Sequence, residues 1–259
     1  MIDINTVDQS QLFDRFAVDY DQLLSDWDSE LVEQGRILDN LIRIHSSSQV
    51  HTVLDCTCGI GTQCIGLAKL GYQVTGTDIS SKSVERSRHE SSRFGVDVQF
   101  AVADLRELES IVQEKFDCVI SCDNSLPALL TAEDVKAGLK QMYLRLKPGG
   151  ISIISIRNYE SLFKEKKSFH PRQIHRTPNG RRVVFDLWEY PSDEIVVFNV
   201  FFLEEGPTGW EVVTREMVYR AIFSEDLVAM LKEAGFKDVE IVRDLNSNKL
   251  PFDFYISRR

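Results

Sequence analysis

The stretch VLDCTCGIGTQ, residues 53–63, joins a short apolar run to a glycine-containing turn and the start of a helix. Gly59 and Gly61 allow a tight turn with no Cβ in the way, and the following helix directs its positive end toward a ligand. Three kinds of site fit this arrangement: the phosphate cradle of a dinucleotide-binding fold, a cysteine knuckle that binds a metal, and the turn that holds another nucleoside cofactor.

Two of these sites agree poorly with the flanking residues. The dinucleotide fingerprint requires a third glycine three positions after the second, where this chain has Cys64. A metal knuckle requires a second pair of ligands, and neither a CxxC pair nor paired histidines accompany Cys56 and Cys58. We therefore expect no metal site. An odd number of cysteines fits reduced thiols better than a disulfide framework: Cys56, Cys58, Cys64, Cys118 and Cys122.

The hydrophobic pattern along most of the chain alternates between strands and helices. Strands are predicted over 51–56, 72–78, 96–104, 116–122, 151–156, 237–242 and 252–259. Helices are predicted over 28–44, 61–70, 80–94, 133–146 and 224–234. Because buried β-rich runs separated by amphipathic helices are typical of a parallel sheet covered on both faces, the pattern predicts an α/β fold.

A different pattern interrupts this alternation after Tyr159. Three long β-type runs follow one another between residues 181 and 223, separated by turns that contain proline or glycine. They predict an antiparallel β meander inserted into the α/β frame. We expect the insertion to cover the active site or to make a dimer contact, because a hairpin alone does not stabilise so many large apolar residues. His170 and His175, just before it, are expected on a surface loop, with a lid near the acceptor as the alternative.

Three acidic residues stand at the ends of successive predicted strands: Asp55, Asp78 and Asp104. In a doubly wound sheet the carboxyl ends of the strands form the ligand crevice. A carboxylate at Asp78 suits both hydroxyls of a ribose, and Asp104 is placed to meet an adenine amino group while Leu105 packs against the ring. Such a set of acids suits a positively charged nucleoside without phosphates, and it suits a pyrophosphate badly.

This order of features resembles the class I S-adenosylmethionine-dependent methyltransferases. The resemblance implies S-adenosylmethionine as cofactor and a Rossmann-like, seven-stranded, mostly parallel sheet whose last strand is antiparallel. We expect one domain, 1–259, with an N-terminal helical cap (1–50), a core (51–165 and 223–259) and an inserted β subdomain (166–222). The residues predicted to bind the cofactor are Tyr20, Trp27, Arg36, Thr57, Gly59, Gly61, Asp78, Ile79, Asp104, Leu105, Cys122 and Ser125.

Some of these cofactor assignments have a structural alternative. Tyr20 and Trp27 are expected to close over the cofactor, Trp27 by a cation–π contact, or else to pack the N-terminal helices onto the sheet. Arg36 pairs with the cofactor carboxylate or lies on a helix surface. Asp78 is a ribose ligand or only a cap for the helix over 80–94.

A closer resemblance, to glycine N-methyltransferase and its bacterial glycine/sarcosine relatives, rests on CDNSLPALL (122–130), SIRNYE (155–160) and the N-terminal YDQLLSDWDSELVEQG (20–35). It implies that Asn124 and Arg157 hold the methyl acceptor. Arg157 would bind its carboxylate, and Asn124 would accept a hydrogen bond from its amine. The insertion offers phenylalanines where the mammalian enzymes of that family use tyrosines, so acceptors other than glycine stay open.

Charge and composition narrow the partners. The chain has 30 Lys and Arg against 40 Asp and Glu, a formal net charge of −10, which disfavours nucleic acid and anionic membranes. The segment DNSLP also lacks the Asp/Asn-Pro-Pro-aromatic motif of enzymes that methylate bases. We expect a small-molecule acceptor, a cytoplasmic protein without signal peptide or membrane span, and either a monomer or a homo-oligomer. A non-catalytic module that binds the cofactor or its demethylated product, and an O-methyltransferase for a small acid or phenol, stay as alternatives.

Overall fold

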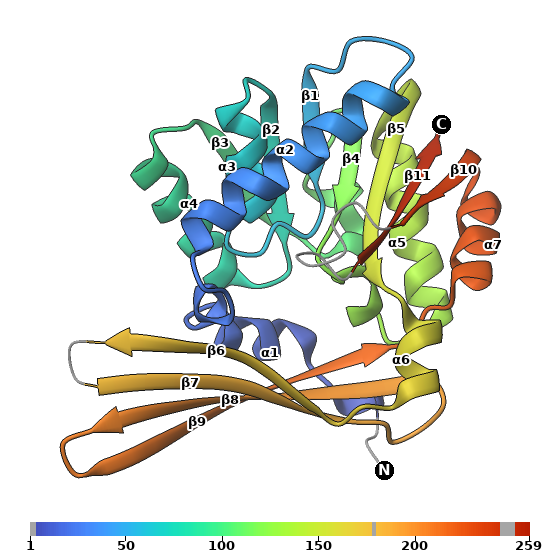
Figure 1. Ribbon diagram of the computed structural model, residues 1–259. Coiled ribbons are helices and arrows are strands. Elements are labelled where there is room, and N and C mark those ends of the chain that lie inside the picture. Colours follow the sequence, from blue (N-terminus) through green and yellow to red (C-terminus); the bar gives the residue numbers. More distant parts are fainter. Residues whose placement is uncertain (1–3, 178–179, 244–251) are drawn as a thin grey trace.

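The computed structural model describes residues 4–177, 180–243 and 252–259, and its main feature is a seven-stranded sheet (Figure 1). The strand order is β3-β2-β1-β4-β5-β11-β10. Strand β11 runs antiparallel to β5 and to β10, and the other neighbouring pairs are parallel, so the predicted antiparallel last strand is confirmed. The strands are β1 Thr52–Asp55, β2 Gln73–Asp78, β3 Val98–Val102, β4 Phe116–Ser121, β5 Leu146–Arg157, β10 Lys237–Val242 and β11 Phe252–Arg258.

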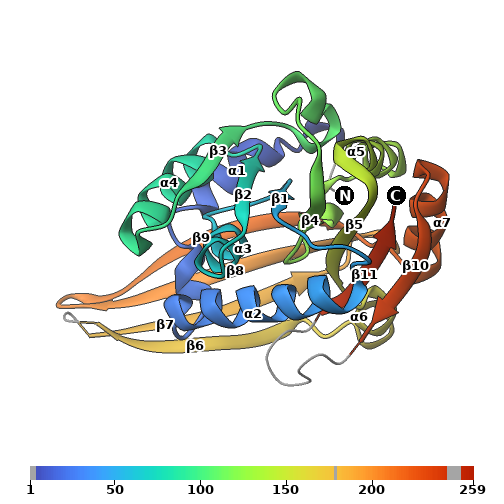
Figure 2. The same ribbon diagram turned by 90° about the horizontal axis from the view of Figure 1, so that it is seen from above.

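Helices cover both faces of this sheet, as the sequence predicts (Figure 2). On one face lie α2 Trp27–His45, α3 Thr62–Lys69 and α4 Ser81–Phe94. On the other lie η3 Leu105–Ser110, α5 Ala132–Arg145 and α7 Ser224–Ala234. Side-chain caps begin these helices where the sequence has serine or threonine: the Ser80 hydroxyl accepts from the Ser83 N–H, and that of Thr131 from the Asp134 N–H.

The two-sided burial of the sheet explains its nearly continuous apolar strands. Successive residues of a strand point to opposite faces. Val53 joins a hydrophobic cluster with Leu38 and Leu41 of α2, whereas its neighbour Leu54 joins the cluster of the opposite face, which includes Leu139 of α5. Both β1 residues are fully buried, so neither face tolerates a polar residue without a partner.

The insertion is an antiparallel sheet of four strands, β6 Phe169–Thr177, β7 Gly180–Glu189, β8 Ile195–Gly206 and β9 Gly209–Arg220, and it follows α6 Tyr159–Glu165 (Figure 1). The predicted meander is confirmed, but the surface loop expected around His170 and His175 is wrong, because both lie on β6. This strand pairs with β7 alone and has a register shift between Pro171 and Gln173. Proline has no N–H to donate to the hydrogen bonds between strands, so the sequence around Pro171 does not predict a strand.

The N-terminal segment places α1 between the two sheets (Figure 1). It contains η1 Ile4–Thr6, α1 Gln9–Phe16 and η2 Tyr20–Leu23. Phe16 packs into the same hydrophobic cluster as Val200 and Phe202 of the insertion and Leu139 of α5, so the insertion and the frame share one core. Within the described residues, no helix combines the length and apolar character required to cross a membrane.

Candidate active site

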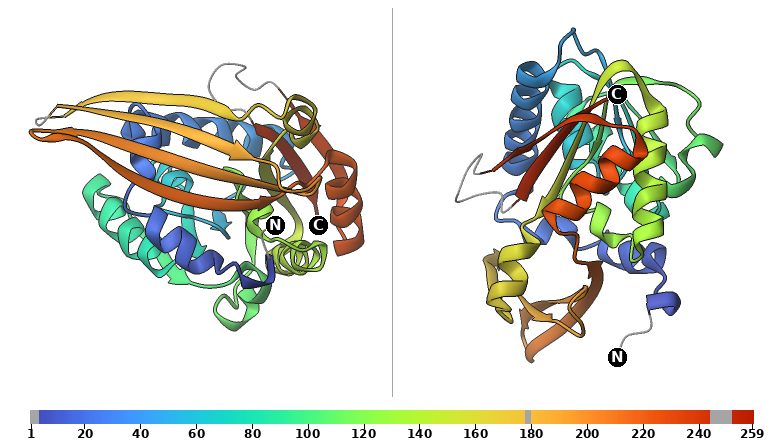
Figure 3. Two further views of the ribbon diagram at one scale, coloured as in Figure 1. Left: turned by 90° about the horizontal axis from the view of Figure 1, so that it is seen from below. Right: turned by 90° about the vertical axis from the view of Figure 1, so that its right-hand side faces the viewer.

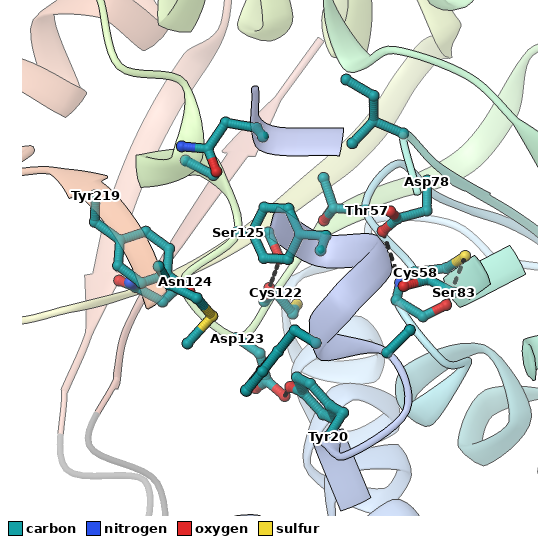
Figure 4. A pocket seen from close by; sticks show the side chains of 18 of the residues that line it. Tyr20, Thr57, Cys58, Asp78, Ser83, Cys122, Asp123, Asn124, Ser125 and Tyr219 are labelled. Atoms are coloured by element: carbon teal, nitrogen blue, oxygen red, sulfur yellow. Dashed lines mark hydrogen bonds between the residues drawn. The ribbon is translucent and has the colours of Figure 1, made fainter. Parts of the chain in front are cut away.

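A cavity of about 810 Å³ lies at the carboxyl ends of the parallel strands, between the large sheet and the inner face of the insertion. Its walls come from the turn after β1, the ends of β2, β4 and β5, the N-terminal segment and strands β6, β8 and β9. Figure 4 shows Thr57 and Asp78 on one side of this cavity and Asn124 and Tyr219 on the other. The predicted ligand crevice therefore exists where the topology places it.

The turn after β1 is built to bring backbone close to a ligand. Gly59 has φ +52°, and no heavy atom lies within 4 Å of the position of an added Cβ. Its N–H donates to Oδ2 of Asp78 at 2.8 Å, while Oδ1 of Asp78 accepts from the Ser80 N–H at 2.9 Å. Gly61, with φ +96°, is the N-cap of α3. Burial raises the pKa of Asp78. Asp78 thus ties the turn to β2 while it lines the cavity.

Asp55, the first of the three strand-end acids, has a different place. Its side chain is fully buried and lies outside the residues that line the cavity. It accepts from the Thr57 N–H at 3.1 Å and from the Cys64 thiol at 3.5 Å. Burial raises the pKa of Asp55 to about 7, despite these hydrogen bonds. Asp55 therefore supports the turn from behind.

Asp55→Asn tests this buried carboxyl. The unfolded carboxyl ionises near its ordinary value and the folded one near 7. Between these values the unfolded state binds fewer protons, so this group makes the free energy of unfolding fall as the pH rises. Relative to wild type, the asparagine variant should gain about 2–3 kcal/mol between pH 5 and pH 8. Urea unfolding of both proteins at the two pH values measures this gain, and equal pH dependence would contradict the assignment.

Asp104 lines the cavity beside the buried Leu105, but its carboxylate is already engaged. Arg106 donates to it from Nε and Nη2, the latter at 2.6 Å, and also pairs with Asp134 at 3.0 Å. Burial raises the pKa of Asp104, but the hydrogen bonds from Arg106 outweigh this effect and lower it below its ordinary value. Contact between Asp104 and an adenine amino group stays a prediction, and it requires an oxygen shared with Arg106.

The turn after β4 holds Asp123 and Asn124 at φ +56° and +65°, a conformation uncommon for residues other than glycine. Ser155 of β5 stabilises this turn. The Oγ of Ser155 accepts a hydrogen bond from the Asp123 N–H at 2.9 Å, and the Ser155 carbonyl accepts one from the Asn124 N–H at 3.0 Å. Oδ1 of Asn124 accepts from the Arg157 N–H at 3.0 Å and from the Tyr159 hydroxyl at 3.2 Å.

The buried Nδ2 of Asn124 has no hydrogen-bond partner among the described residues. The expectation that Asn124 accepts a hydrogen bond from the amine of the acceptor stays a prediction. It requires Oδ1 to be shared with the Arg157 N–H and the Tyr159 hydroxyl.

Arg157, at the end of β5, lines the cavity without an acidic partner among the described residues. Its guanidinium lies 5.3 Å from the ring centre of Trp188, 5.5 Å from that of Phe198 and 5.3 Å from that of Phe252. Its Nε is buried and unpaired. Burial lowers the pKa of Arg157, and the nearby positive charge of Arg172 acts in the same direction. Among the described residues, the site therefore holds a desolvated cation without an ion pair of its own, since the nearby Asp186 is paired with Arg172.

The cavity wall contains a polar cluster of which the sequence predicted only Tyr20. Gln63 donates to Gln34 at 2.6 Å, and Gln34 donates to Asp123 at 3.4 Å. The Tyr20 hydroxyl also donates to Asp123 at 3.4 Å, and burial raises the pKa of that carboxyl. Glu30 lines the cavity beside them. The position of Asp123, just past a strand end, was the available signal, whereas Gln34 gave none because helical periodicity marks only apolar residues.

The remaining predicted residues divide into two groups. Ile79, Cys122 and Ser125 line the cavity. Trp27 and Arg36 lie outside the lining residues: Trp27 is buried and donates to Thr62 Oγ1 at 3.0 Å, and Arg36 is exposed on α2. No cluster of metal-ligating side chains occurs within the described parts of the chain.

Comparison with known proteins indicates a methyltransferase. Residues 53–150 match the family model described as "Methyltransferase domain". The chain is 25% identical, over 96% of its length and 89% of the relative, to a glycine/sarcosine N-methyltransferase from Aphanothece halophytica. Two solved structures share its fold. The CcbJ methyltransferase from Streptomyces caelestis has a TM-score of 0.78 at 17% identity, covering 97% of this chain and 99% of that one.

The second is SAM-bound CalS10, an amino pentose methyltransferase from Micromonospora echinaspora, with a TM-score of 0.73 at 16% identity, covering 88% of this chain and 91% of that one. The strand order, the open turn at Gly59 and the family match define a class I S-adenosylmethionine-dependent methyltransferase. The chain resembles that class in sequence and fold, and S-adenosylmethionine is its cofactor.

Proposed function

We propose that this enzyme methylates the amine of a small compound that carries a carboxylate. The observation that carries the proposal is Arg157 in the cavity wall, whose buried Nε has no hydrogen-bond partner among the described residues. The relative from Aphanothece halophytica, named for glycine and sarcosine, agrees with such an acceptor. A small molecule also suits a chain of net charge −10 better than nucleic acid does.

The other two arginines of the cavity wall sharpen this argument. Arg106 pairs with Asp104 and Asp134, and Arg172 makes a two-pronged pair with the buried Asp186, both contacts at 2.6 Å. Arg157 has donors of the same geometry but makes no ion pair with an acid among the described residues. A carboxylate on the acceptor supplies the missing charge and accepts two parallel hydrogen bonds from the planar fork. The free Nδ2 of Asn124 is a further donor for the same anionic end.

The cofactor is proposed to occupy the opposite side of the cavity. Asp78 takes the ribose hydroxyls, Leu105 and Asp104 meet the adenine, and the open backbone at Gly59 admits close approach. The cluster around Asp123 and Tyr20 then receives the ammonium of the methionyl part. Thr57, Ile79, Cys122 and Ser125 complete the wall, and Gly61 fixes the start of α3.

Methyl transfer requires little more from the protein than the correct placement of the acceptor amine relative to the methyl group. Bound S-adenosylmethionine supplies a methyl group on a positively charged sulfur. Arg157 and Asn124 fix the acceptor, so that its neutral amine points at that methyl group. Phe198, Met217 and Tyr219 of the insertion give the acceptor side an apolar wall that excludes water. The His170 ring stacks on the Trp188 ring with 3.7 Å between ring centres, and His170 does not line the cavity. We therefore assign His170 no role as a base.

A screen of methyl acceptors tests the proposed function. Purified enzyme with S-adenosylmethionine is offered amino acids, amines without an acid, small acids and phenols, and methylated products are detected by mass spectrometry. The proposal expects turnover on amines that carry a carboxylate. Turnover only on acids or phenols would favour an O-methyltransferase, and calorimetric cofactor binding without turnover would favour a non-catalytic module.

A further inference from the structure

The two faces of the inserted sheet have different surroundings. Residues alternate between the faces along each strand. Phe198, Met217 and Tyr219 belong to the inner face, which lines the cavity. Their neighbours belong to the outer face, onto which Figure 3, left, looks, with strands β6–β9 in front of the large sheet.

The outer face is apolar and largely uncovered. Pairing places Ile174, Val183, Leu203 and Val212 side by side in one row across the four strands. In the next row the rings of Phe185 and Phe201 are stacked, with 5.0 Å between their centres. Large side chains here are unusually accessible: Ile174 72%, Val212 58%, Phe169 50%, Trp210 45% and Leu187 38%.

One end of the same face is already covered by this chain. Val197 and Val218, which continue the outer face toward the start of β8, are buried and pack with Ile4 and Val7 of the N-terminal segment. The uncovered part begins at the next row, with Leu187, Asn199 and Glu216. The chain thus protects this surface at one end only.

The size of the uncovered part suits a modest protein interface. Four rows across four strands, at about 4.8 Å between strands and about 6.7 Å between alternate residues, give a plan area of roughly 500 Å². Protruding side chains add to this value. The plan area is below the roughly 800 Å² that each partner contributes to a standard interface, and it is in the upper part of the range of roughly 300–600 Å² for the largest patch of a monomer, so we expect a small interface.

One charged pair on this face, Arg181 with Glu205, matches a second copy of the chain. The last row contains Arg181 and Glu205 on neighbouring strands, paired at 2.8 Å, with the Arg181 guanidinium 5.4 Å from the ring centre of Trp210. A two-fold axis parallel to the strands, placed between the two outer faces, sets β7 of one copy opposite β8 of the other. Each row of one copy then lies opposite the same row of the other copy. Arg181 then faces Glu205 of the other copy, Phe185 faces Phe201, and Val183 faces Leu203.

From this pattern we propose that two copies of the chain form a dimer by packing these outer faces together, with the two-fold axis parallel to the strands. Aligned packing of two sheets is a common geometry, and the same surface patch is used by both copies. The dimer buries the apolar rows and leaves both cavities on the outside. The insertion then serves both the active site and the dimer contact.

A double substitution on the exposed row tests the interface. Ile174→Glu with Val212→Glu places glutamates at the two ends of the exposed row, where the proposed axis sets Ile174 of one copy opposite Val212 of the other. Ile44→Glu, on the 64% exposed Ile44 of α2, is the matched control. Sedimentation equilibrium should show a wild-type dimer whose dissociation constant rises about 100-fold or more in the double variant and less than about twofold in the control. A monomeric wild type up to about 200 μM, above the micromolar range that small interfaces reach, would overturn the proposal, as would a double variant that dimerises like wild type.

Mixing two charge variants tests the axis and does not depend on the double variant folding. Arg181→Glu alone places glutamate opposite Glu205, and Glu205→Arg alone places arginine opposite Arg181, so each should dimerise more weakly than wild type. In a mixed pair, every contact again joins opposite charges. Mixing should therefore restore dimers with about tenfold higher affinity than either variant alone. Absence of this restoration would overturn the proposed axis.

Discussion

Replacing Arg157 with lysine should lower kcat/KM for a carboxylate-bearing amine by about tenfold or more, while the Kd for S-adenosylmethionine stays within about twofold. Lysine keeps the positive charge but loses the planar fork that fixes the acceptor at one distance and angle. It also loses contact with three aromatic rings, at 5.3–5.5 Å, that hold the guanidinium in place. Steady-state kinetics measures the first quantity and calorimetry the second.

Arg43→Lys is the matched control for this experiment. Arg43 is exposed on α2 and pairs only locally, with Asp39 at 2.8 Å, so its substitution should leave both quantities unchanged. If the Arg157 variant has wild-type kcat/KM on the best carboxylate-bearing acceptor, Arg157 does not bind that carboxylate. A fall in cofactor affinity as large as the fall in kcat/KM would instead point to a structural role for Arg157.

The second large effect is expected at Asp78. Asp78→Ala should weaken S-adenosylmethionine binding by about 1.5–3 kcal/mol, or about 10–150-fold in Kd. The variant loses the acceptor for the ribose hydroxyls and also the contact at 2.8 Å that holds the Gly59 N–H. Isothermal titration with S-adenosylmethionine and with its demethylated product measures the change.

Asp97→Ala controls for the removal of an acid from the same region, because Asp97 is exposed just before β3. It should bind the cofactor as wild type does. Unchanged affinity in the Asp78 variant, with a lowered thermal midpoint, would mean that Asp78 only ties the turn to β2 and caps the start of α4.

The frame of the fold was predictable because its constraints are local and repeated. Strands buried on both faces, such as β1 with Val53 and Leu54, are apolar at successive positions, and the helix predicted to begin at Ser80 is capped by that serine. Strand β6 was not predictable in this way. It is an edge strand with Pro171 near its register shift, and its pairing with β7 compensates for a weak local preference.

Site residues were predictable where the end of a strand determines their position. They were not predictable where a contact formed only in the folded chain determines it. Asp78, Asn124 and Arg157 reach the cavity because they end or follow parallel strands. The periodicity of α2 does not show in which direction Trp27 or Arg36 points. The proposed donor role of Asn124 depends on Tyr159 and the Arg157 backbone, which are adjacent only in the folded chain.

The most direct measurement compares amino acids with their carboxamides as methyl acceptors of the wild-type enzyme, glycine and sarcosine among them. Each pair offers the same amine and differs in the charge that Arg157 is proposed to bind. The amine of the carboxamide is less basic and more often neutral, which by itself favours the carboxamide. The account predicts that the best acid of the panel has a kcat/KM at least about tenfold above that of its carboxamide. Equal or faster methylation of the carboxamide would contradict it.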